Sequence, residues 1–205
     1  LIEAWKWTSA DSTVCVLPLH HVHGVVNVVS CSLWAGATCE FMPNFSEKAI
    51  FDLITEERIN VFMAVPTIYF KLINYWESQT ERDQIHLTNA LAKLRLMISG
   101  SAALPVSVME RWKSISTHLL LERYGMTEIG MALSNPYDGP RVAGHVGYPL
   151  PGVAVRLSEE GEIQVKGANV FKEYWQKPES TAESFTEDGW FKTGDIAAID
   201  ELGGY

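Results

Sequence analysis

Cysteine, basic charge and long hydrophobic runs are all scarce in this 205-residue sequence. Three cysteines form an odd, sparse set, which argues against a disulfide-built scaffold and favours reduced thiols in an intracellular compartment. Acidic residues outnumber basic ones by 25 to 16, a net charge of −9, whereas surfaces that bind nucleic acid are basic. The best apolar stretch, Val25 to Cys39, is broken by polar residues and falls short of the roughly 18 residues of a spanning helix. We therefore expect neither a nucleic-acid partner nor a transmembrane segment.

The residues that are present indicate a globular fold. Hydrophobic residues make up 47% of the sequence and charged residues 20%, a composition that supports a substantial core and is unlike that of a disordered chain. At ~150 residues per domain, the length allows one large domain or one with a small appendage. The sequence begins without Met and stops at Gly203-Gly204-Tyr205, a turn signal, so we expect it to be part of a longer chain.

Short β-branched runs alternate with helix-length segments, an order typical of α/β folds. Strands are predicted at residues 14–17, 37–42, 60–64, 95–98, 119–121, 153–157 and 162–166. Helices are predicted over residues 22–34, 46–57 and 66–76 and after Pro105, with a polar surface loop at 77–86. Proline and glycine become dense after Ser134. We therefore predict an α/β portion over residues 1–134 and a β-rich portion over residues 135–205.

Two segments at predicted strand ends contain chemically suggestive residues. His20, His21 and His23 lie at a strand-to-helix junction, and together they raise the possibility of zinc. Their spacing does not let all three face one ion, so histidine packed at a strand end is the preferred interpretation. The small residues from Ser99 to Pro105 could offer backbone amides to an anion or a ring edge, or could serve tight packing alone.

The segment Glu122 to Glu128 combines an aromatic ring, a glycine, a hydroxyl and a carboxylate. We expect a strand to end here and Gly125 to turn the chain, so that Thr127 and Glu128 follow on a short turn. A hydroxyl and a carboxylate so placed suit phosphate and Mg²⁺, and Tyr124 could stack on a flat base. The alternative is a helix N-terminus capped by Thr127.

The segment Asp188 to Asp195 is predicted to form a hairpin-like turn, with Asp195 opening a strand that continues over residues 196–199. A carboxylate in such a place can bind both hydroxyls of a ribose, as acidic residues do in dinucleotide-binding folds. The alternative is a turn aspartate that bonds its own backbone.

Taken in order, these segments resemble the adenylate-forming enzymes, a family that includes acyl-CoA synthetases, luciferases and the adenylation domains of peptide synthetases. Tyr-Gly-Met-Thr-Glu (residues 124–128) and Gly-Trp-Phe-Lys-Thr-Gly-Asp (residues 189–195) resemble its core motifs. Residues 18–24, 99–105 and 161–175 fit further motifs in the same order. Within the family, the fullest match is to the malonyl-CoA synthetases.

The resemblance implies an ATP-dependent acid–thiol ligase with small-molecule substrates: an acid, Mg·ATP and coenzyme A. It places Thr127 at a phosphate and Glu128 at Mg²⁺. Tyr124 would stack on adenine, Asp195 would bind the ribose, and His21 would sit beside the reacting carboxylate. The full nucleotide site would comprise Ser101, Ala102, Ala103, Tyr124, Gly125, Met126, Thr127 and Asp195.

Malonate has a second carboxylate, which would be costly to bury unpaired. Arg123 can offer it a bidentate guanidinium, and Ser101 can add a hydroxyl. Lys71 stands where bacterial members of this group carry Arg, so a charged contact is kept without the bidentate geometry. We therefore expect selectivity for a dicarboxylate.

The family also has parts that this sequence lacks. A phosphate loop with its Lys is expected before Leu1, and a hinge and C-terminal domain with the catalytic Lys are expected after Tyr205. Without them, the segment alone is expected to be inactive. The resemblance suggests the mitochondrial matrix in animals and the cytosol elsewhere. Three alternatives stay open: a ligase for another short, fatty or aryl acid, a truncated non-catalytic nucleotide-binding module, and a zinc protein.

Overall fold

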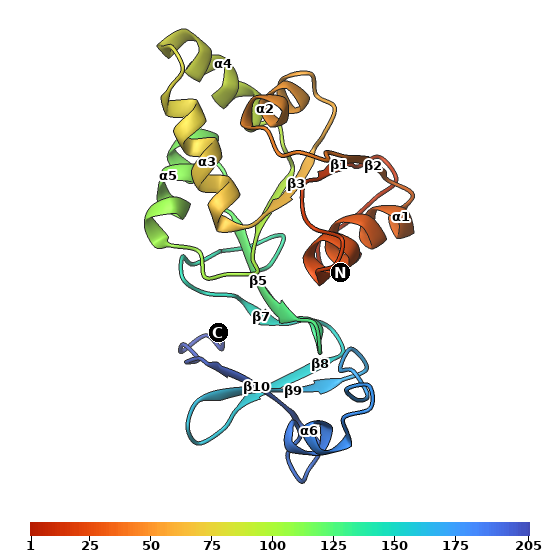
Figure 1. Cartoon of the computed structure of the whole chain (residues 1–205). Helices are drawn as coiled ribbons and strands as arrows, with labels where there is room; N and C mark the ends of the chain where they lie inside the picture. Colours follow the sequence, from red (N-terminus) through yellow and green to blue (C-terminus); the bar gives the residue numbers. More distant parts are fainter.

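The computed structural model describes residues 1–205 and contains two sheets flanked by helices (Figure 1). The first sheet comprises β1 (Ser12–Cys15), β2 (Thr38–Phe41), β3 (Val61–Ala64), β4 (Leu96–Ser99), β5 (Leu121–Met126), β6 (Gly130–Ser134) and β7 (Tyr148–Pro149). The second comprises β8 (Val153–Leu157), β9 (Glu162–Gly167) and β10 (Phe191–Ile196). The helices are η1 (His23–Ser30), α1 (Cys31–Ala35), α2 (Glu47–Thr55), α3 (Pro66–Glu77), α4 (Glu81–Leu91), α5 (Val106–Ser116) and α6 (Pro178–Glu183).

The first sheet has the strand order β2-β1-β3-β4-β5-β6-β7. The first five strands in that order are parallel, and β6 and β7 are antiparallel additions at one edge. Every residue of β3 and β4 is buried, which is why these strands read as continuous apolar runs. The prediction of an α/β fold is confirmed.

Helices cover both faces of this sheet, and successive residues of each central strand serve opposite faces. Phe62 of β3 belongs to a core formed with helices α2–α5, together with Trp112. Met63, the next residue, belongs to a second core with η1, α1 and the fully buried Trp5. Figure 1 shows α2–α5 gathered on one side and α1 on the other.

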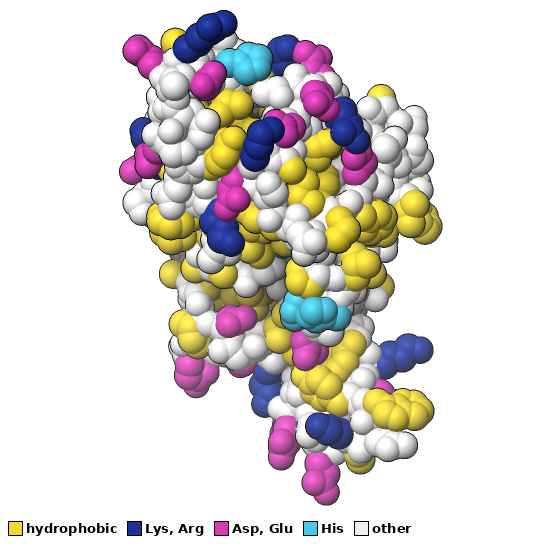
Figure 2. Space-filling model, turned by 45° about the horizontal axis from the view of Figure 1, so that its top comes forward, with side chains coloured by type: hydrophobic (Ala, Val, Ile, Leu, Met, Phe, Trp, Pro, Cys, Tyr) yellow, Lys and Arg dark blue, Asp and Glu magenta, His cyan; other side chains and the backbone are white.

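The second sheet is a three-stranded antiparallel unit with the order β10-β9-β8. Its inner face packs on β6 through a third core that includes Leu133, Val165 and Phe191. Residues 153–205, which include this sheet and α6, form the second lobe, the smaller one at the bottom of Figure 1. On the face shown in Figure 2, acidic and basic side chains are interspersed over the larger body. None of the helices is long and apolar enough to cross a lipid bilayer.

Local signals at helix ends match the structure well. The Ser46 hydroxyl accepts the Ala49 N–H at 3.3 Å, as expected of an N-cap. The helix predicted over residues 22–34 exists as η1 followed by α1, and it ends at Gly36, whose φ of 72° is left-handed.

The polar loop predicted at residues 77–86 is wrong over most of its length, because α4 begins at Glu81. Thr80 caps this helix, with its hydroxyl accepting the Asp83 N–H at 3.3 Å. The helix buries only Leu87, Ala90 and Leu91, so its apolar stripe is too sparse to read from the sequence.

Two strand boundaries also differ from prediction. The strand predicted over residues 119–121 begins only at Leu121 and runs to Met126, and Gly125, predicted to turn the chain, lies within it. Asp195 lies near the end of β10, whereas it was predicted to open a strand over 196–199. In both places charged or glycine residues occupy the incompletely buried end of a strand, where burial does not select apolar side chains.

Candidate functional site

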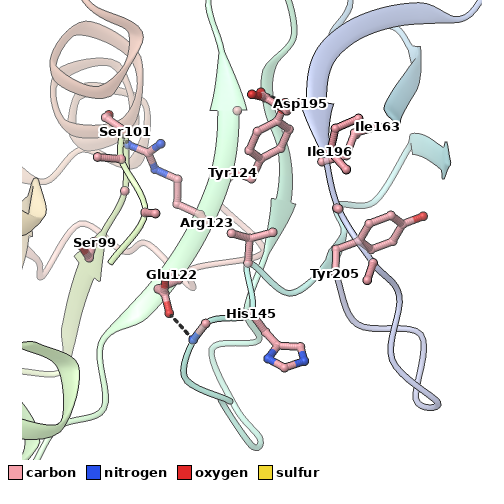
Figure 3. A pocket seen from close by; sticks show the side chains of 18 residues that line it. Ser99, Ser101, Glu122, Arg123, Tyr124, His145, Ile163, Asp195, Ile196 and Tyr205 are labelled. Carbon is pink, nitrogen blue, oxygen red and sulfur yellow. Dashed lines mark hydrogen bonds between the residues drawn. The ribbon is translucent and has the colours of Figure 1, made fainter. Parts of the chain in front are cut away.

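A cavity of about 630 Å³ lies where the carboxyl end of β4 meets β5 and the second sheet. Parallel α/β sheets bind ligands at this edge, because loops and strand ends converge there. Figure 3 shows the side chains around it. The cavity is lined by residues 99–103, 122–125, 144–146 and 195–198, with Ile163 and Tyr205.

Consecutive residues of β5 point to opposite sides of that strand. Figure 3 shows Arg123 directed toward Ser101 and Tyr124 directed toward Asp195. The alternation follows from the pleat of the strand. It divides the site into a part beside the 99–103 loop and a part beside β10.

Arg123 is a buried cation without an acidic partner. Its side chain is only 3% exposed, and its Nη2 donates to Ser101 Oγ at 3.2 Å. Its Nε has no hydrogen-bond partner. Burial lowers the pKa of Arg123 to about 10, so the guanidinium remains charged at neutral pH. A buried, uncompensated guanidinium with a free donor is suited to an anionic ligand.

The backbone beside Arg123 is shaped to fit it. A Cβ added to Gly100 would lie 2.5 Å from Arg123 Cζ, so only glycine leaves room for the guanidinium. Ser101 has a φ of 68°, a left-handed conformation that is uncommon for a residue with a side chain. This backbone turn brings the Ser101 hydroxyl to Arg123.

His23 is the histidine that joins this cluster. It is buried, and its Nδ1 lies 3.1 Å from Ser101 Oγ. Burial and the nearby Arg123 charge lower the pKa of His23 to about 2, so the ring is neutral. Because the Ser101 oxygen accepts from Arg123, we assign its O–H to His23 Nδ1 and the ring proton to Nε2. His23 Nε2 has no partner in the structure.

The other two histidines of the motif do not join the cluster. His20 and His21 are exposed, with their ring centroids 4.3 Å apart. No group of three or more His, Cys, Asp or Glu residues is placed to hold a metal ion. The arrangement gives the zinc alternative no ligand set.

On the other side of β5, Tyr124 Oη donates to Asp195 Oδ2 at 2.6 Å. Burial, and then the bond to Asp195, raises the pKa of Tyr124. Gly125 permits this geometry, because a Cβ there would lie 2.0 Å from the Gly130 carbonyl oxygen at a bulge between β5 and β6. Two residues 71 apart in sequence therefore face one cavity.

Thr127 and Glu128 lie in the turn between β5 and β6, so the alternative of a helix N-terminus is wrong. The Thr127 side chain is exposed, and Glu128 Oε1 accepts from Tyr174 Oη at 2.9 Å. One carboxylate and one hydroxyl fit a Mg²⁺ ion that takes its remaining ligands from phosphate and water, as Mg²⁺ prefers.

The cavity contains some of the predicted site residues and not others. Those that line it are Ser101, Ala102, Ala103, Arg123, Tyr124, Gly125 and Asp195. Those that do not line it are His21, Lys71, Met126, Thr127 and Glu128. The Lys71 ammonium lies 5.4 Å from the centre of the Phe45 ring.

Sequence reasoning missed two residues of this region. His23 was visible in the histidine motif, but nothing in the sequence ranked it above its neighbours. Glu122 also lines the cavity, 5% exposed, and its Oε1 accepts the Gly144 N–H at 3.3 Å. Burial raises the pKa of Glu122 to about 7. A buried glutamate in a strand has no sequence signal of its own.

Comparison with known proteins identifies the family. Residues 1–175 match the family of AMP-binding enzymes. The chain is 50% identical to the mitochondrial malonate–CoA ligase ACSF3 of Xenopus laevis over 233 residues, which cover 96% of this chain and 40% of that protein. It is also 50% identical to a malonate–CoA ligase of Arabidopsis thaliana, covering all of this chain and 36% of that protein.

Solved structures agree with this relationship. The ATP-bound crystal structure of MatB from Rhodopseudomonas palustris is 41% identical, with a TM-score of 0.90 over the whole of this chain and 41% of its own. A malonyl-CoA ligase with methylmalonyl-CoA and AMP bound gives a TM-score of 0.91 at 40% identity, over the whole of this chain and 45% of its own. The chain thus spans about 40% of the length of the curated relatives it matches. Family membership, predicted from the motifs, is confirmed: the chain belongs to the AMP-binding, adenylate-forming enzymes.

Proposed function

We propose that the full-length protein is an ATP-dependent acid–thiol ligase that converts malonate into malonyl-CoA through malonyl-AMP. One observation carries the choice of a dicarboxylate: the Arg123 guanidinium is buried beside Ser101 and has no acidic partner. The names of the relatives, which are malonate–CoA ligases, support the same reaction.

The reaction has two half-reactions. In the first, a carboxylate oxygen of the acid attacks the α-phosphorus of ATP, pyrophosphate leaves, and the acyl-AMP forms. In the second, the sulfur of coenzyme A attacks the acyl carbonyl, AMP leaves, and the thiol proton passes to solvent. Neither step forms a bond to the protein, so its residues act by positioning substrates and stabilising charge.

The part of the cavity beside β10 is the proposed nucleotide site. The Tyr124 ring stacks on adenine, and the backbone of residues 101–103 with Gly125 lines the nucleotide. Met126, outside the cavity lining, is proposed to contact the nucleotide from the end of β5. Asp195 binds the ribose hydroxyls. In support, Tyr124 occupies only Oδ2 of Asp195, so the Oδ1 atom remains available as an acceptor.

Thr127 and Glu128 are proposed to hold the phosphates and Mg²⁺. When bound, this ion neutralises phosphate charge as pyrophosphate leaves. The turn that carries both residues continues directly from Tyr124 and Gly125, which line the cavity. This continuity supports the proposal that the phosphate ligands lie at the end of the nucleotide site.

The part beside the 99–103 loop is the proposed site for the second carboxylate of malonate. Arg123 donates to it, Ser101 holds the guanidinium, and His23 Nδ1, 3.1 Å from Ser101 Oγ, holds the Ser101 hydroxyl in place. Lys71 is proposed to add positive charge from α3. We also propose that His21, at the start of the same motif, approaches the reacting carboxylate when substrates bind.

The placement of the chain in the whole protein is likewise a proposal. Residues 1–134 and 135–205 are the α/β and β-rich portions of a partial AMP-binding domain. The relatives are longer than this chain, and we propose that the phosphate loop and the C-terminal domain come from other parts of the full-length protein. The mitochondrial relatives support the mitochondrial matrix, with the cytosol as the alternative.

A substrate panel with the full-length protein tests this function. Malonate-dependent exchange of pyrophosphate into ATP and formation of a coenzyme A thioester are measured beside methylmalonate, butyrate and benzoate. We expect malonate to give the highest kcat/KM and butyrate about 1–10% of it, because the loss of one charged hydrogen-bonding group costs about 1.5–3 kcal/mol. Preference for butyrate or benzoate would make the protein a ligase for another acid. ATP binding without exchange for any acid would indicate a non-catalytic nucleotide-binding module.

A further inference from the structure

The segment from Asn169 to Tyr174, which follows β9, is bonded to the turn between β5 and β6. Asn169 Nδ2 donates to the Ile129 carbonyl at 2.7 Å. The Phe171 N–H donates to the Glu128 carbonyl at 2.7 Å, and Tyr174 Oη donates to Glu128 Oε1 at 2.9 Å. Three hydrogen bonds therefore tie two consecutive turn residues to the second lobe.

The Tyr174 hydroxyl is held by aromatic packing. Its ring meets the Phe171 ring edge-on, with centroids 4.6 Å apart. Phe171 in turn packs against Phe185 and Phe191, with centroid distances of 5.9 and 5.4 Å. Phe191 is buried in the core of the second lobe. The hydroxyl that reaches Glu128 is thus anchored to a rigid cluster.

The bond to Tyr174 uses one of the two carboxylate oxygens of Glu128. No other side-chain bond to this carboxylate and no ion pair restrains it. The side chain would otherwise sample several rotamers on a turn, and fixing one of them costs conformational entropy when a ligand binds. With Oε1 held, Oε2 has a defined position and is free to accept a ligand.

We propose that Tyr174 is a positioning residue for Glu128, fixing its carboxylate so that Oε2 faces Mg²⁺. This inference rests on the proposed function, which assigns Glu128 to the ion. Residues that hydrogen-bond to a metal ligand without touching the metal typically change metal affinity by about 10- to 100-fold when removed. The inference also makes the second lobe part of the metal site, because Tyr174 and its aromatic support belong to that lobe.

The test uses the full-length protein with Tyr174→Phe, which removes the hydroxyl and keeps the ring on Phe171. Mn²⁺ binding is measured by electron paramagnetic resonance in the presence of the non-hydrolysable analogue β,γ-imido-ATP. We expect the dissociation constant of Mn²⁺ to rise about 10-fold. Tyr75→Phe is the matched control, because the Tyr75 ring stacks on Phe51 at 5.3 Å and its hydroxyl makes no hydrogen bond. It should leave Mn²⁺ binding unchanged.

Glu128→Gln separates this inference from the function on which it rests. If Glu128→Gln weakens Mn²⁺ binding and Tyr174→Phe does not, Tyr174 has no positioning role and the proposed metal site stands. If Glu128→Gln also binds Mn²⁺ like the wild type, the metal assignment itself is wrong. If both weaken it, the double variant should bind no more weakly than Glu128→Gln alone, since both changes act through one carboxylate. An additive loss would overturn the inference.

Discussion

Gly100 and the Arg123 guanidinium are so close that a Cβ on Gly100 would lie 2.5 Å from Arg123 Cζ. Gly100→Ala should therefore displace the guanidinium more than it disturbs Tyr124 and Asp195 on the nucleotide side of the cavity. In the full-length protein, we expect the KM for malonate, the proposed substrate, to rise at least 10-fold, because a displaced guanidinium would lose its charged hydrogen bonds to the acid. The KM for ATP should stay within about twofold. Equal increases in both constants in steady-state kinetics would show that the change disturbs the whole site.

His23 is predicted to act as a neutral hydrogen-bonding group. Its pKa of about 2 lies far below the assay range, so it does not titrate between pH 5.5 and 8. In the full-length protein, His23→Ala should raise the KM for malonate severalfold, and His23→Asn, whose amide oxygen can accept the Ser101 O–H in place of Nδ1, should restore part of the loss. The pH profile of kcat/KM for malonate should have the same shape in the wild type and in His23→Asn. Loss of an acidic limb near pH 6.5 in the variant would mean that His23 is protonated during turnover.

Glu122 is predicted to make stability depend on pH. Burial raises the pKa of Glu122 to about 7 from its ordinary value of 4.5, so the folded state binds this proton more tightly than the unfolded state. The contribution of protonated Glu122 to the free energy of unfolding is therefore complete below about pH 4.5 and is lost as the pH rises through 7. Glu122→Gln should reduce the loss of stability between pH 5 and 8 by on the order of 3 kcal/mol. Urea unfolding at pH 5 and pH 8 measures this difference. Equal losses of stability in the wild type and in Glu122→Gln would contradict the prediction.

The buried ion pair of Asp11 with Arg95 is predicted to stabilise the fold. Asp11 is 3% exposed and accepts two 2.6 Å bonds from Arg95 and one of 3.0 Å from Asn60. Burial alone would raise the pKa of Asp11, but the bonds and charge of Arg95 outweigh it and lower the pKa. This stabilisation is present above the unfolded pKa of 3.8 and is lost as the pH falls. Asp11→Ala should cost about 3–5 kcal/mol in urea unfolding at pH 7.

The exposed pair of Lys48 and Asp52 provides the matched control. Its atoms lie 2.8 Å apart on one face of α2, and both side chains are at least half exposed. Asp52→Ala should change stability by less than about 1 kcal/mol. A similar cost for Asp11→Ala and Asp52→Ala would show that burial does not strengthen the Asp11 pair.

The sequence predicts the fold class and most elements, because the central strands are apolar throughout and the helix ends carry ordinary caps. Pro66, Ser46 and Gly36 mark helix boundaries where the structure has them. Helix α4 was missed because its buried face is confined to its last turns. A helix stabilised by few buried residues and many charged ones has no periodicity to detect.

In the candidate site, the sequence predicts which motifs contribute residues but not which side chains contact one another. The motif positions of Tyr124 and Asp195 were predictable, and their 2.6 Å hydrogen bond was not, because it depends on how two sheets meet. His21 and His23 differ by two positions in one motif, yet only His23 is buried against Ser101. The helical turn that decides which histidine faces inward comes from packing of the whole domain.

The kinetics of Arg123→Ala with malonate and butyrate test the proposed selectivity most directly. The full-length protein is assayed by acid-dependent pyrophosphate release at saturating ATP. We predict that kcat/KM for malonate falls at least 100-fold, while that for butyrate stays within about threefold or rises, because only malonate presents a second carboxylate to the guanidinium. An equal fall for both acids would contradict the assignment of Arg123 as the residue that selects a dicarboxylate.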